Sequence, residues 1–289
     1  MRCTLYPDVP SFLAATQDWL ERDPVVNNIV ATNMLMRVGG PLQGEDHPML
    51  ITVAAPAGTV VGAAVRTPPR SLLLAHIPAA VALTIADFVA RMRAAGVFAA
   101  ELPGVVGPVT AAEPFAVRWL ELTGAAGRVE MRQRAFRLDR VQPPAGVAGR
   151  FRLAAAADLD LCFGWMIDFQ SEALPQQPKI HRERIADTIA DGRMGLWEDA
   201  GRSVSMVGRT IPAAGVIRIG PVYTPPELRR HGYGSACTAE MSRRALESGA
   251  TACTLTTDLA NPTSNAIYRR IGYYPVADGV SILFDRPGS

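Results

Sequence analysis

The stretch Glu227–Ala250, ELRRHGYGSACTAEMSRRALESGA, contains two glycines at the predicted start of a helix. Small or apolar residues recur at every fourth position of that helix and predict that it packs on a sheet, at Tyr233, Cys237, Met241 and Ala245. Gly232 and Gly234 carry no side chains, and the first turn of a helix has N–H groups without intrahelical partners. We therefore expect this turn to hold an anionic diphosphate. The alternative is an ordinary glycine-rich turn, because short glycine motifs match often by chance.

The segments on either side of this turn alternate helices and strands. In the second half we expect a strand at Phe151, helices from Asp158 and over His181–Ala190, strands joined at Asp199–Gly201, and a strand over GVIRIGPVYT. In the first half the pattern predicts helices over 78–95 and 110–122, strands over 97–102 and 129–138, and a hairpin at Ala57 and Gly58. Prolines and glycines between Asp139 and Arg150 indicate a boundary near Pro144. The sequence therefore predicts an α/β protein with domains at 1–142 and 151–289 and a linker at 143–150.

Composition narrows the class of protein. With 289 residues, 48% of them hydrophobic, the chain can bury the cores of two domains. Its net charge of +2 is small and scattered, which does not favour a nucleic-acid partner. The first thirty residues show no secretion signal and no apolar run is long enough for a bilayer, so we expect a cytoplasmic protein without a membrane partner. The four cysteines show no metal-ligand spacing and are expected to be buried hydrophobes, at Cys3, Cys162, Cys237 and Cys253.

Two other phosphate-binding patterns do not fit the turn. A P-loop needs GxxxxGK followed by serine or threonine, and no lysine lies near Gly232. A dinucleotide fold usually shows GxGxxG with an acidic residue about twenty positions later. The order of elements around the turn must therefore decide its function.

The chain resembles the GNAT N-acetyltransferase superfamily, whose pyrophosphate loop reads Gln/Arg-x-x-Gly-x-Gly/Ala between a strand and a helix. RRHGYG supplies Arg229, Gly232 and Gly234 in that register. Downstream, ACTLTTDLANPTSNAIYRRIGYYPV is similar to the family's next strand, an asparagine-containing turn, and a helix with Tyr268. The resemblance covers residues 151–289. It implies a mixed central sheet flanked by helices, acetyl-CoA as co-substrate and no metal.

The resemblance also implies the residues that bind acetyl-CoA. Backbone groups at the end of the fourth strand would pair with the pantetheine arm, at Val222, Tyr223 and Thr224. The turn would receive the pyrophosphate, at Arg229, Arg230, His231, Gly232, Tyr233, Gly234 and Ser235. Asn261 and Asn265 would bind the pantetheine or its far end. Helix capping is the alternative for these asparagines, because Asn261 precedes Pro262 at a predicted helix start.

Tyr268 matches the tyrosine that protonates the departing CoA thiolate in many members of the family. An amine that attacks the thioester forms a tetrahedral intermediate and expels a sulfur anion, so a proton donor is needed. The alternative is a core tyrosine whose ring packs on the sheet.

The general base is less well defined by the sequence. Glu172 and Glu198 are the first carboxylates to consider, and His181 and His231 are further candidates because imidazole titrates near neutrality. A solvated surface role is the alternative for each of the four. Arg218 lies in the fourth strand, where it could face the substrate, and we expect it instead to pair with a carboxylate across the sheet.

The first half has a similar order of helices and strands but lacks the glycine motif. RTPPRSLLLAHIP stands where the pyrophosphate loop would be, and proline has no N–H to offer a phosphate. We therefore expect two GNAT-like domains, the first degenerate and the second active. The predicted function is transfer of an acetyl group from acetyl-CoA to a primary amine on a small molecule or peptide. The alternative is a non-catalytic acyl-CoA sensor or interaction protein on the same scaffold.

Overall fold

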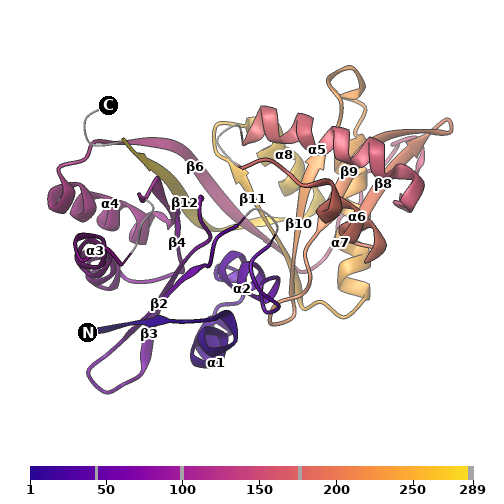
Figure 1. Cartoon of the computed structure of the whole chain (residues 1–289). Helices are drawn as coiled ribbons and strands as arrows, with labels where there is room; N and C mark the ends of the chain where they lie inside the picture. The colour runs from indigo at the N-terminus through magenta and orange to yellow at the C-terminus, as the bar shows by residue number, and fades with distance from the viewer. Residues whose placement is uncertain (43–44, 98–100, 175–177, 286–289) are drawn as a thin grey trace. The chain divides into compact units, whose positions relative to one another are not determined.

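The chain forms two compact units, and the computed structural model describes residues 1–42, 45–97, 101–174 and 178–285 (Figure 1). The first unit comprises Met1–Ala135, Thr256–Ala260 and the residues from Val276 onward. The second comprises Phe136–Leu255 and Asn261–Pro275. The chain thus returns to the first unit after it has formed most of the second. The division at residues 143–150 stays a prediction.

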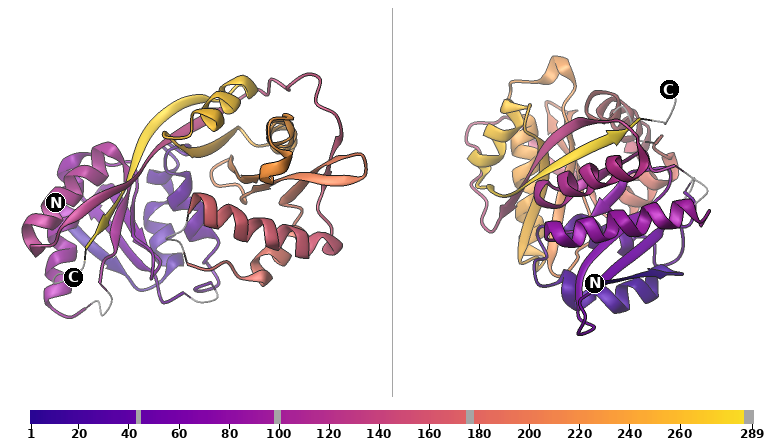
Figure 2. Two further views of the ribbon diagram at one scale, coloured as in Figure 1. Left: turned by 90° about the horizontal axis from the view of Figure 1, so that it is seen from above. Right: turned by 90° about the vertical axis from the view of Figure 1, so that its left-hand side faces the viewer.

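The first unit is a mixed sheet with helices. Its elements are β1 Arg2–Tyr6, α1 Val9–Leu20, α2 Asn28–Leu35, β2 Met49–Ala54, β3 Val60–Arg66, β4 Leu72–Leu74, α3 Ala79–Ala94, β5 Gly104–Pro108, α4 Val109–Thr123, β6 Gly127–Leu138 and most of β12 Tyr274–Phe284. The strand order is β1-β2-β3-β4-β5-β12-β6. Strands β4 and β5 are parallel, whereas β12 pairs antiparallel with β5. The right-hand view of Figure 2 shows α3 and α4 side by side in front of these strands.

Most predicted elements of the first unit are confirmed. The two helices, the strand at 129–138 and the hairpin match α3, α4, β6 and the β2–β3 turn, where Gly58 has a positive φ of 89°. Of the strand predicted over 97–102, residues 98–100 lie outside the described residues, and Val97, Glu101 and Leu102 are not in a strand; β5 begins at Gly104. A Cβ on Gly104 would lie 2.3 Å from the backbone oxygen of Ile282 on β12. Because Gly104 has no side chain, strand β12 from the far end of the chain can lie close to it. In the sequence alone, a glycine here would be expected to interrupt a strand.

The second unit carries the turn with the two glycines. Its elements are β7 Arg150–Leu153, α5 Leu159–Ala173, α6 Arg182–Ala190, β8 Met194–Asp199, β9 Arg202–Arg209, β10 Val216–Tyr223, α7 Tyr233–Glu247, the first half of β11 Ala252–Asp258, and α8 Pro262–Ile271. The strand order is β11-β10-β9-β8-β7. Strands β7 to β10 are antiparallel, and β10 and β11 are parallel. Each element predicted here from the sequence is confirmed.

Two hydrophobic clusters lie on opposite faces of the second sheet, because side chains of a strand alternate between its faces. Val207 packs with α7 residues such as Cys237 and Met241. Its neighbour Met206 packs with Cys162 of α5 and with α6. Helices α7 and α8 therefore cover one face and α5 and α6 the other, which leaves the ends of the strands for a site.

A buried polar contact in the α7 cluster gives a test of this packing. The Tyr273 hydroxyl lies 2.8 Å from Ser242 Oγ, which itself donates to the carbonyl of Thr238. We expect Tyr273→Phe to lower the free energy of unfolding by about 1 kcal/mol, because one net hydrogen bond is lost. Ser242→Ala should cost more, since it leaves the buried Tyr273 hydroxyl without its partner. Urea unfolding of both variants and the double variant measures this, and fully additive losses would contradict the contact.

Candidate functional site

The pairing of β10 changes abruptly in its middle. With β11 it pairs only from Val216 to Arg218, whose partner is Thr254. With β9 its register shifts between Ile219 and Val222. Among the residues that the structure describes, the edge of β10 that faces β11 therefore makes no strand pairing beyond Arg218. Backbone groups on such an edge can pair with an extended ligand.

The end of β10 is held in place by a serine of the neighbouring strand. Ser205 Oγ donates to the carbonyl of Tyr223 at 3.0 Å and lies 2.9 Å from Thr224 Oγ1. Ser205 is fully buried, and the sequence analysis missed it. The only signal is a serine at a position of β9 where the neighbouring residues Val204 and Met206 are apolar.

The turn after β10 has the geometry expected of an anion site. Arg230 and Gly232 both have a positive φ, 69° and 83°. Helix α7 begins at Tyr233, and its first hydrogen bond runs from the Ala236 N–H to the Gly232 carbonyl. The N–H groups of the first turn, from Tyr233 to Ser235, therefore have no intrahelical partner, and no side chain caps them.

The glycines allow the turn to approach the strand end closely. A Cβ on Gly234 would lie 3.1 Å from Thr224 Oγ1 and 3.7 Å from Val222 Cγ1. A Cβ on Gly232 would lie 2.9 Å from Val147 Cγ2, and its positive φ already disfavours a side chain. Larger residues would fill the space between α7 and β10. The helix dipole and the open N–H groups fit a diphosphate here.

Several side chains of the turn have local partners. Arg229 donates to the Thr224 carbonyl at 2.9 Å and to Glu172 at 2.7 Å. His231 stacks on Tyr233, whose hydroxyl donates to Asp199 at 2.5 Å. The exposed guanidinium of Arg230 has no ion-pair partner among the described residues. Arg230 is thus the arginine of the motif that is most available to a ligand.

Glu172 lies beside the proposed binding strand. Its carboxylate accepts from Arg229 and lies 3.5 Å from the Tyr223 hydroxyl. Burial, then the charges of Asp168 and Glu172, raise the pKa of Tyr223. The side chain of Glu172 remains 45% exposed, so it connects the end of α5 to the turn while it is open to solvent.

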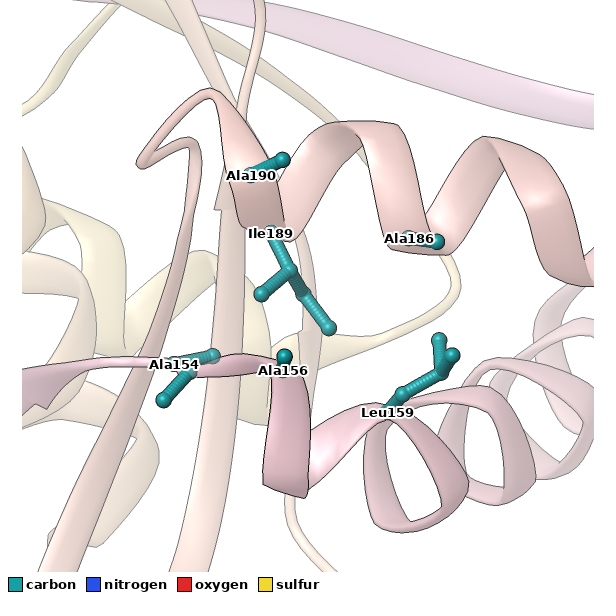
Figure 3. Close-up of a pocket in the computed structure, with 7 residues that line it drawn as sticks. Ala154, Ala156, Leu159, Ala186, Ile189 and Ala190 are labelled. Carbon is teal, nitrogen blue, oxygen red and sulfur yellow. The ribbon is translucent and has the colours of Figure 1, made fainter.

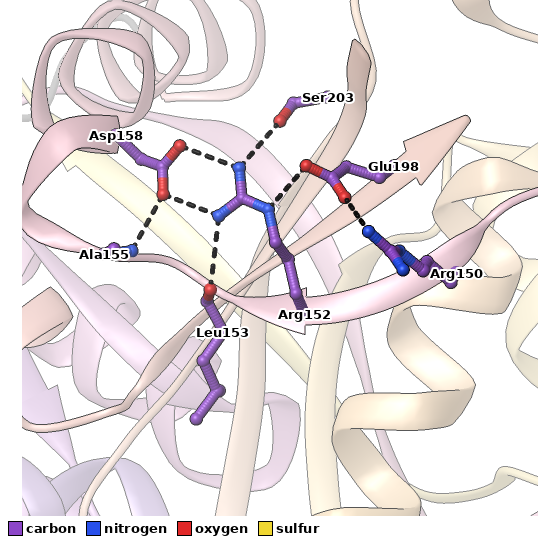
Figure 4. Close-up of polar contacts among 7 residues, drawn as sticks. All are labelled: Arg150, Arg152, Leu153, Ala155, Asp158, Glu198 and Ser203. Carbon is purple, nitrogen blue, oxygen red and sulfur yellow. Dashed lines mark hydrogen bonds and ion pairs between the residues drawn. The ribbon is translucent and has the colours of Figure 1, made fainter. Parts of the chain in front are cut away.

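Glu198 has a different environment. Its carboxylate accepts from Arg152 at 2.7 Å and from Arg150 at 3.5 Å, and Arg152 also bonds Asp158 and Ser203 (Figure 4). The hydrogen bond and charge of Arg152 hold the pKa of Glu198 below its usual range. This favours the ionised carboxylate but makes it a weak base. A catalytic role of Glu198 stays a prediction.

The asparagines at the start of α8 interact with the helix backbone. Asn261 Oδ1 accepts from the Ser264 N–H at 3.0 Å, with Pro262 at the first helical position. The amide of Asn265 donates to the Asn261 carbonyl at 2.7 Å. The capping alternative is therefore present for Asn261. A contact of either residue with pantetheine stays a prediction.

Tyr268 lies on α8, and its ring contacts the rings of Phe136 and Tyr273 at centroid distances of 6.5 and 6.1 Å. Within the described part of the chain, its hydroxyl has no hydrogen-bond partner. Burial raises its pKa to about 12. The hydroxyl therefore keeps its proton at neutral pH and can act as a donor.

Two further residues named from the sequence are His181 and Arg218. His181 precedes α6, and no hydrogen bond of its side chain caps that helix. The expected carboxylate partner of Arg218 is contradicted, because no acidic side chain in the described ranges pairs with this guanidinium. The sequence could not show this, because it does not reveal which residues lie opposite one another in the sheet.

The next observations concern the cysteines, possible metal ligands and possible membrane-spanning helices. Cys162, Cys237 and Cys253 are buried and free, and Cys3 is partly buried, as predicted. No cluster of three or more potential metal ligands occurs in the described residues. Within those same residues, no helix has the length and apolar character needed to cross a membrane.

Two cavities in the second unit do not match a diphosphate. One, of about 300 Å³, is lined only by alanine, leucine and isoleucine side chains, such as Leu159 and Ile189 (Figure 3). The other, of about 360 Å³, borders Tyr223 and also Asp168, Glu227 and Arg202; its two carboxylates outnumber its one guanidinium, which disfavours an anion. The turn at the start of α7 is therefore the better anion site.

Comparison with known proteins agrees with this arrangement. Residues 194–278 match the family model described as FR47-like protein, which spans β8 to β12 and includes the turn. No curated protein matches the chain.

Solved structures match over almost the whole chain. A GCN5-related N-acetyltransferase from Sphaerobacter thermophilus is 18% identical with a TM-score of 0.63, over 100% of this chain and 96% of that one. One from Kribbella flavida is 22% identical with a TM-score of 0.59, over 91% and 96%. A tandem GNAT protein from the clavulanic acid biosynthesis pathway is 12% identical with a TM-score of 0.56, over 100% and 99%.

The chain thus has the fold of these GNAT proteins. At these identities the likeness shows the fold alone, and the tandem neighbour agrees with two GNAT-like domains. The more specific match is to the FR47-like family, over residues 194–278. In the first unit, α3 begins after Pro78 with no glycine in the preceding RTPPRSLLLAHI, so the degenerate character predicted for this half agrees with its structure.

The Arg152 network gives a prediction with a defined pH dependence. Ionised Glu198 is stabilised by Arg152, so its contribution to stability is present above its ordinary pKa and is lost as pH falls through the lowered value. We expect Glu198→Gln to lower the urea midpoint at about pH 7, and we expect this effect to shrink as the pH falls through the lowered pKa and the native carboxyl becomes protonated. Turnover should change little. A large fall in turnover at unchanged stability would make Glu198 catalytic.

Proposed function

We propose that the second unit binds acetyl-CoA and transfers its acetyl group to a primary amine on a small molecule or peptide. The observation that carries the proposal is the open first turn of α7 beside the unpaired edge of β10. A helix terminus with free N–H groups suits a diphosphate, and a strand edge with unpaired backbone groups suits an extended amide-containing arm. The FR47-like match over residues 194–278 includes both features.

In this proposal the backbone provides most contacts to the co-substrate. The N–H groups of Tyr233, Gly234 and Ser235 would bind the diphosphate, and Arg230 would add a positive charge. The edge of β10 from Val222 to Thr224 would pair with the pantetheine arm. Because backbone groups make these contacts, the side chains of the turn can vary provided the glycines remain.

The proposed chemistry is direct attack of the amine on the thioester carbonyl, through a tetrahedral intermediate that expels the CoA thiolate. The attacking amine must be neutral, so a base must take its proton. Tyr268 would donate a proton to the departing sulfur, which its neutral hydroxyl and lack of a partner in the described chain allow. Glu172 and Glu198 are the two carboxylates proposed for the base, and both have an arginine partner.

The co-substrate site can be tested with a pair of variants at Ser235, which lies in the first turn of α7 and makes no hydrogen bond with its side chain to the described residues. Ser235→Glu places a carboxylate where a helix start tolerates one, so the variant should fold. It should also repel the diphosphate and weaken acetyl-CoA binding at least tenfold, or about 1.4 kcal/mol. Ser235→Gln is the neutral control of similar size and should bind more tightly than Ser235→Glu.

Calorimetric titration with acetyl-CoA measures this difference, and thiol release in the presence of amines measures turnover. Equal affinity of both Ser235 variants would place the diphosphate elsewhere. Tight binding without thiol release from any amine would contradict the enzyme and favour a CoA-binding protein.

Tyr268→Phe tests the proton donor. We expect turnover to fall about 100-fold, the usual scale for a general acid, while acetyl-CoA affinity changes little. Because burial raises the pKa of Tyr268 to about 12, the ratio of native to variant turnover should stay constant through about pH 10, where an ordinary tyrosine would ionise. A pH series of kcat for both proteins provides the measurement. Equal turnover would remove Tyr268 from the mechanism.

A further inference from the structure

Arg218 occupies a defined position at the point where β10 leaves β11. It forms the last pair between these strands, with Thr254. Its N–H donates to Thr210 Oγ1 at 3.1 Å, and its carbonyl accepts from the Thr210 N–H at 2.9 Å. The backbone at Arg218 is therefore held by β9 on one side and β11 on the other, so the base of its side chain is fixed.

The side chain of Arg218 leaves the sheet on the face opposite α7. Its neighbours Ile217 and Ile219 both pack in the cluster that contains Cys237 and Met241 of α7. Because successive side chains of a strand alternate between faces, Arg218 projects toward the face that α5 and α6 cover. Tyr268 packs against the α7 cluster, so these two side chains belong to opposite faces.

The guanidinium of Arg218 has no carboxylate partner among the described residues. Burial is the sole cause that lowers its pKa, to about 10. It is nevertheless protonated at neutral pH. Other arginines of this unit, such as Arg152 and Arg229, have carboxylate partners at 2.6 and 2.7 Å. A partly buried charge without a carboxylate partner is unfavourable for a fold, and we infer that its partner is a ligand.

Arg218 also lies toward the reactive end of the proposed co-substrate. The diphosphate would lie at Ser235, and the arm would run along β10 from Thr224 back toward Ile219. The thioester end of the co-substrate would therefore lie near Ile219, the residue that follows Arg218. A group that binds to Arg218 would lie near the acetyl group and not near the diphosphate.

We propose that Arg218 binds a carboxylate of the acceptor, so that the substrate is an amine that also carries a carboxylate, such as an amino acid. This rests on the proposed acetyl transfer. A guanidinium can hold a carboxylate with two parallel hydrogen bonds, which would orient the amine as well as bind it. A free amino acid and the carboxyl end of a short peptide share this chemistry.

The test compares carboxylates with their neutral amides. Thiol release from acetyl-CoA is measured with alanine, phenylalanine and alanyl-alanine, and with the carboxamide of each. We expect kcat/KM to be at least about 100-fold higher for the carboxylates, since an unmatched buried charge discriminates strongly. Comparison of alanyl-alanine with the two free amino acids shows whether the site accepts the carboxyl end of a peptide. Equal rates for acids and amides would overturn the inference.

Variants assign the preference to Arg218. Arg218→Met removes the charge but keeps similar length, and should abolish the preference for carboxylates while leaving rates with amides and acetyl-CoA affinity unchanged. It should not lower the unfolding midpoint, because a partly buried charge without a carboxylate partner is removed. Arg218→Lys should retain part of the preference. If Arg218→Met is less stable and its kcat/KM falls equally for acids and amides, Arg218 has a structural role and the inference is overturned.

Arg209→Met is the matched control. Arg209 is a partly buried arginine opposite Ile219 in the β9–β10 register, and it lies near Cys253, which packs in the α7 cluster. Arg209→Met should leave the preference for carboxylates over amides unchanged.

A binding measurement keeps the inference separate from turnover. N-acetylalanine and its amide are titrated into the protein saturated with CoA. Tighter binding of the acid, lost in Arg218→Met, supports the carboxylate site even if no tested amine reacts. Equal binding overturns it, whereas absence of CoA binding would instead contradict the proposed function.

Discussion

The end of strand pairing after Arg218 and Thr254 is the constraint on which the site depends. Up to this pair, β10 is an interior strand with neighbours on both sides. Beyond it, the bulge between Ile219 and Val222 redirects the strand, and one edge makes no pairing among the described residues. An unpaired edge inside a sheet is costly unless a ligand or solvent satisfies its backbone groups. The same irregularity therefore creates the surface that a pantetheine arm would use.

The turn that follows places open N–H groups beside this edge, where we propose that an anion binds. Ser205 holds the end of β10, and Gly234 allows α7 to start directly against Thr224. The turn's positive potential comes mainly from backbone dipoles, which need no reorganisation when an anion arrives. Across the sheet, the neutral hydroxyl of Tyr268 and the charged guanidinium of Arg218 provide different chemistry on the two faces. In our proposals the tyrosine would transfer a proton and the arginine would bind the acceptor.

Local patterns predicted much of this fold. The four-residue period of α7, the glycine turn and the alternation in β8 to β10 arise from neighbours in the sequence, and each was confirmed. Contacts between distant segments were not predictable. Gly104 begins a strand because Ile282 passes close to it, and Glu198 is engaged because Arg152 lies on the paired strand. That Arg218 lacks a carboxylate partner among the described residues was also not predictable, because the sequence does not show which residues lie opposite it in the sheet.

Hydrogen exchange of the protein with and without CoA tests the central claim most directly, because the site is made of backbone N–H groups. The account predicts slower exchange in peptides that cover Gly232–Ala236 and Ile219–Thr224 when CoA is present. Peptides from the first unit, such as those of β2, should exchange at the same rate in both states. Binding of CoA with protection only outside the second unit would contradict the assignment of the site.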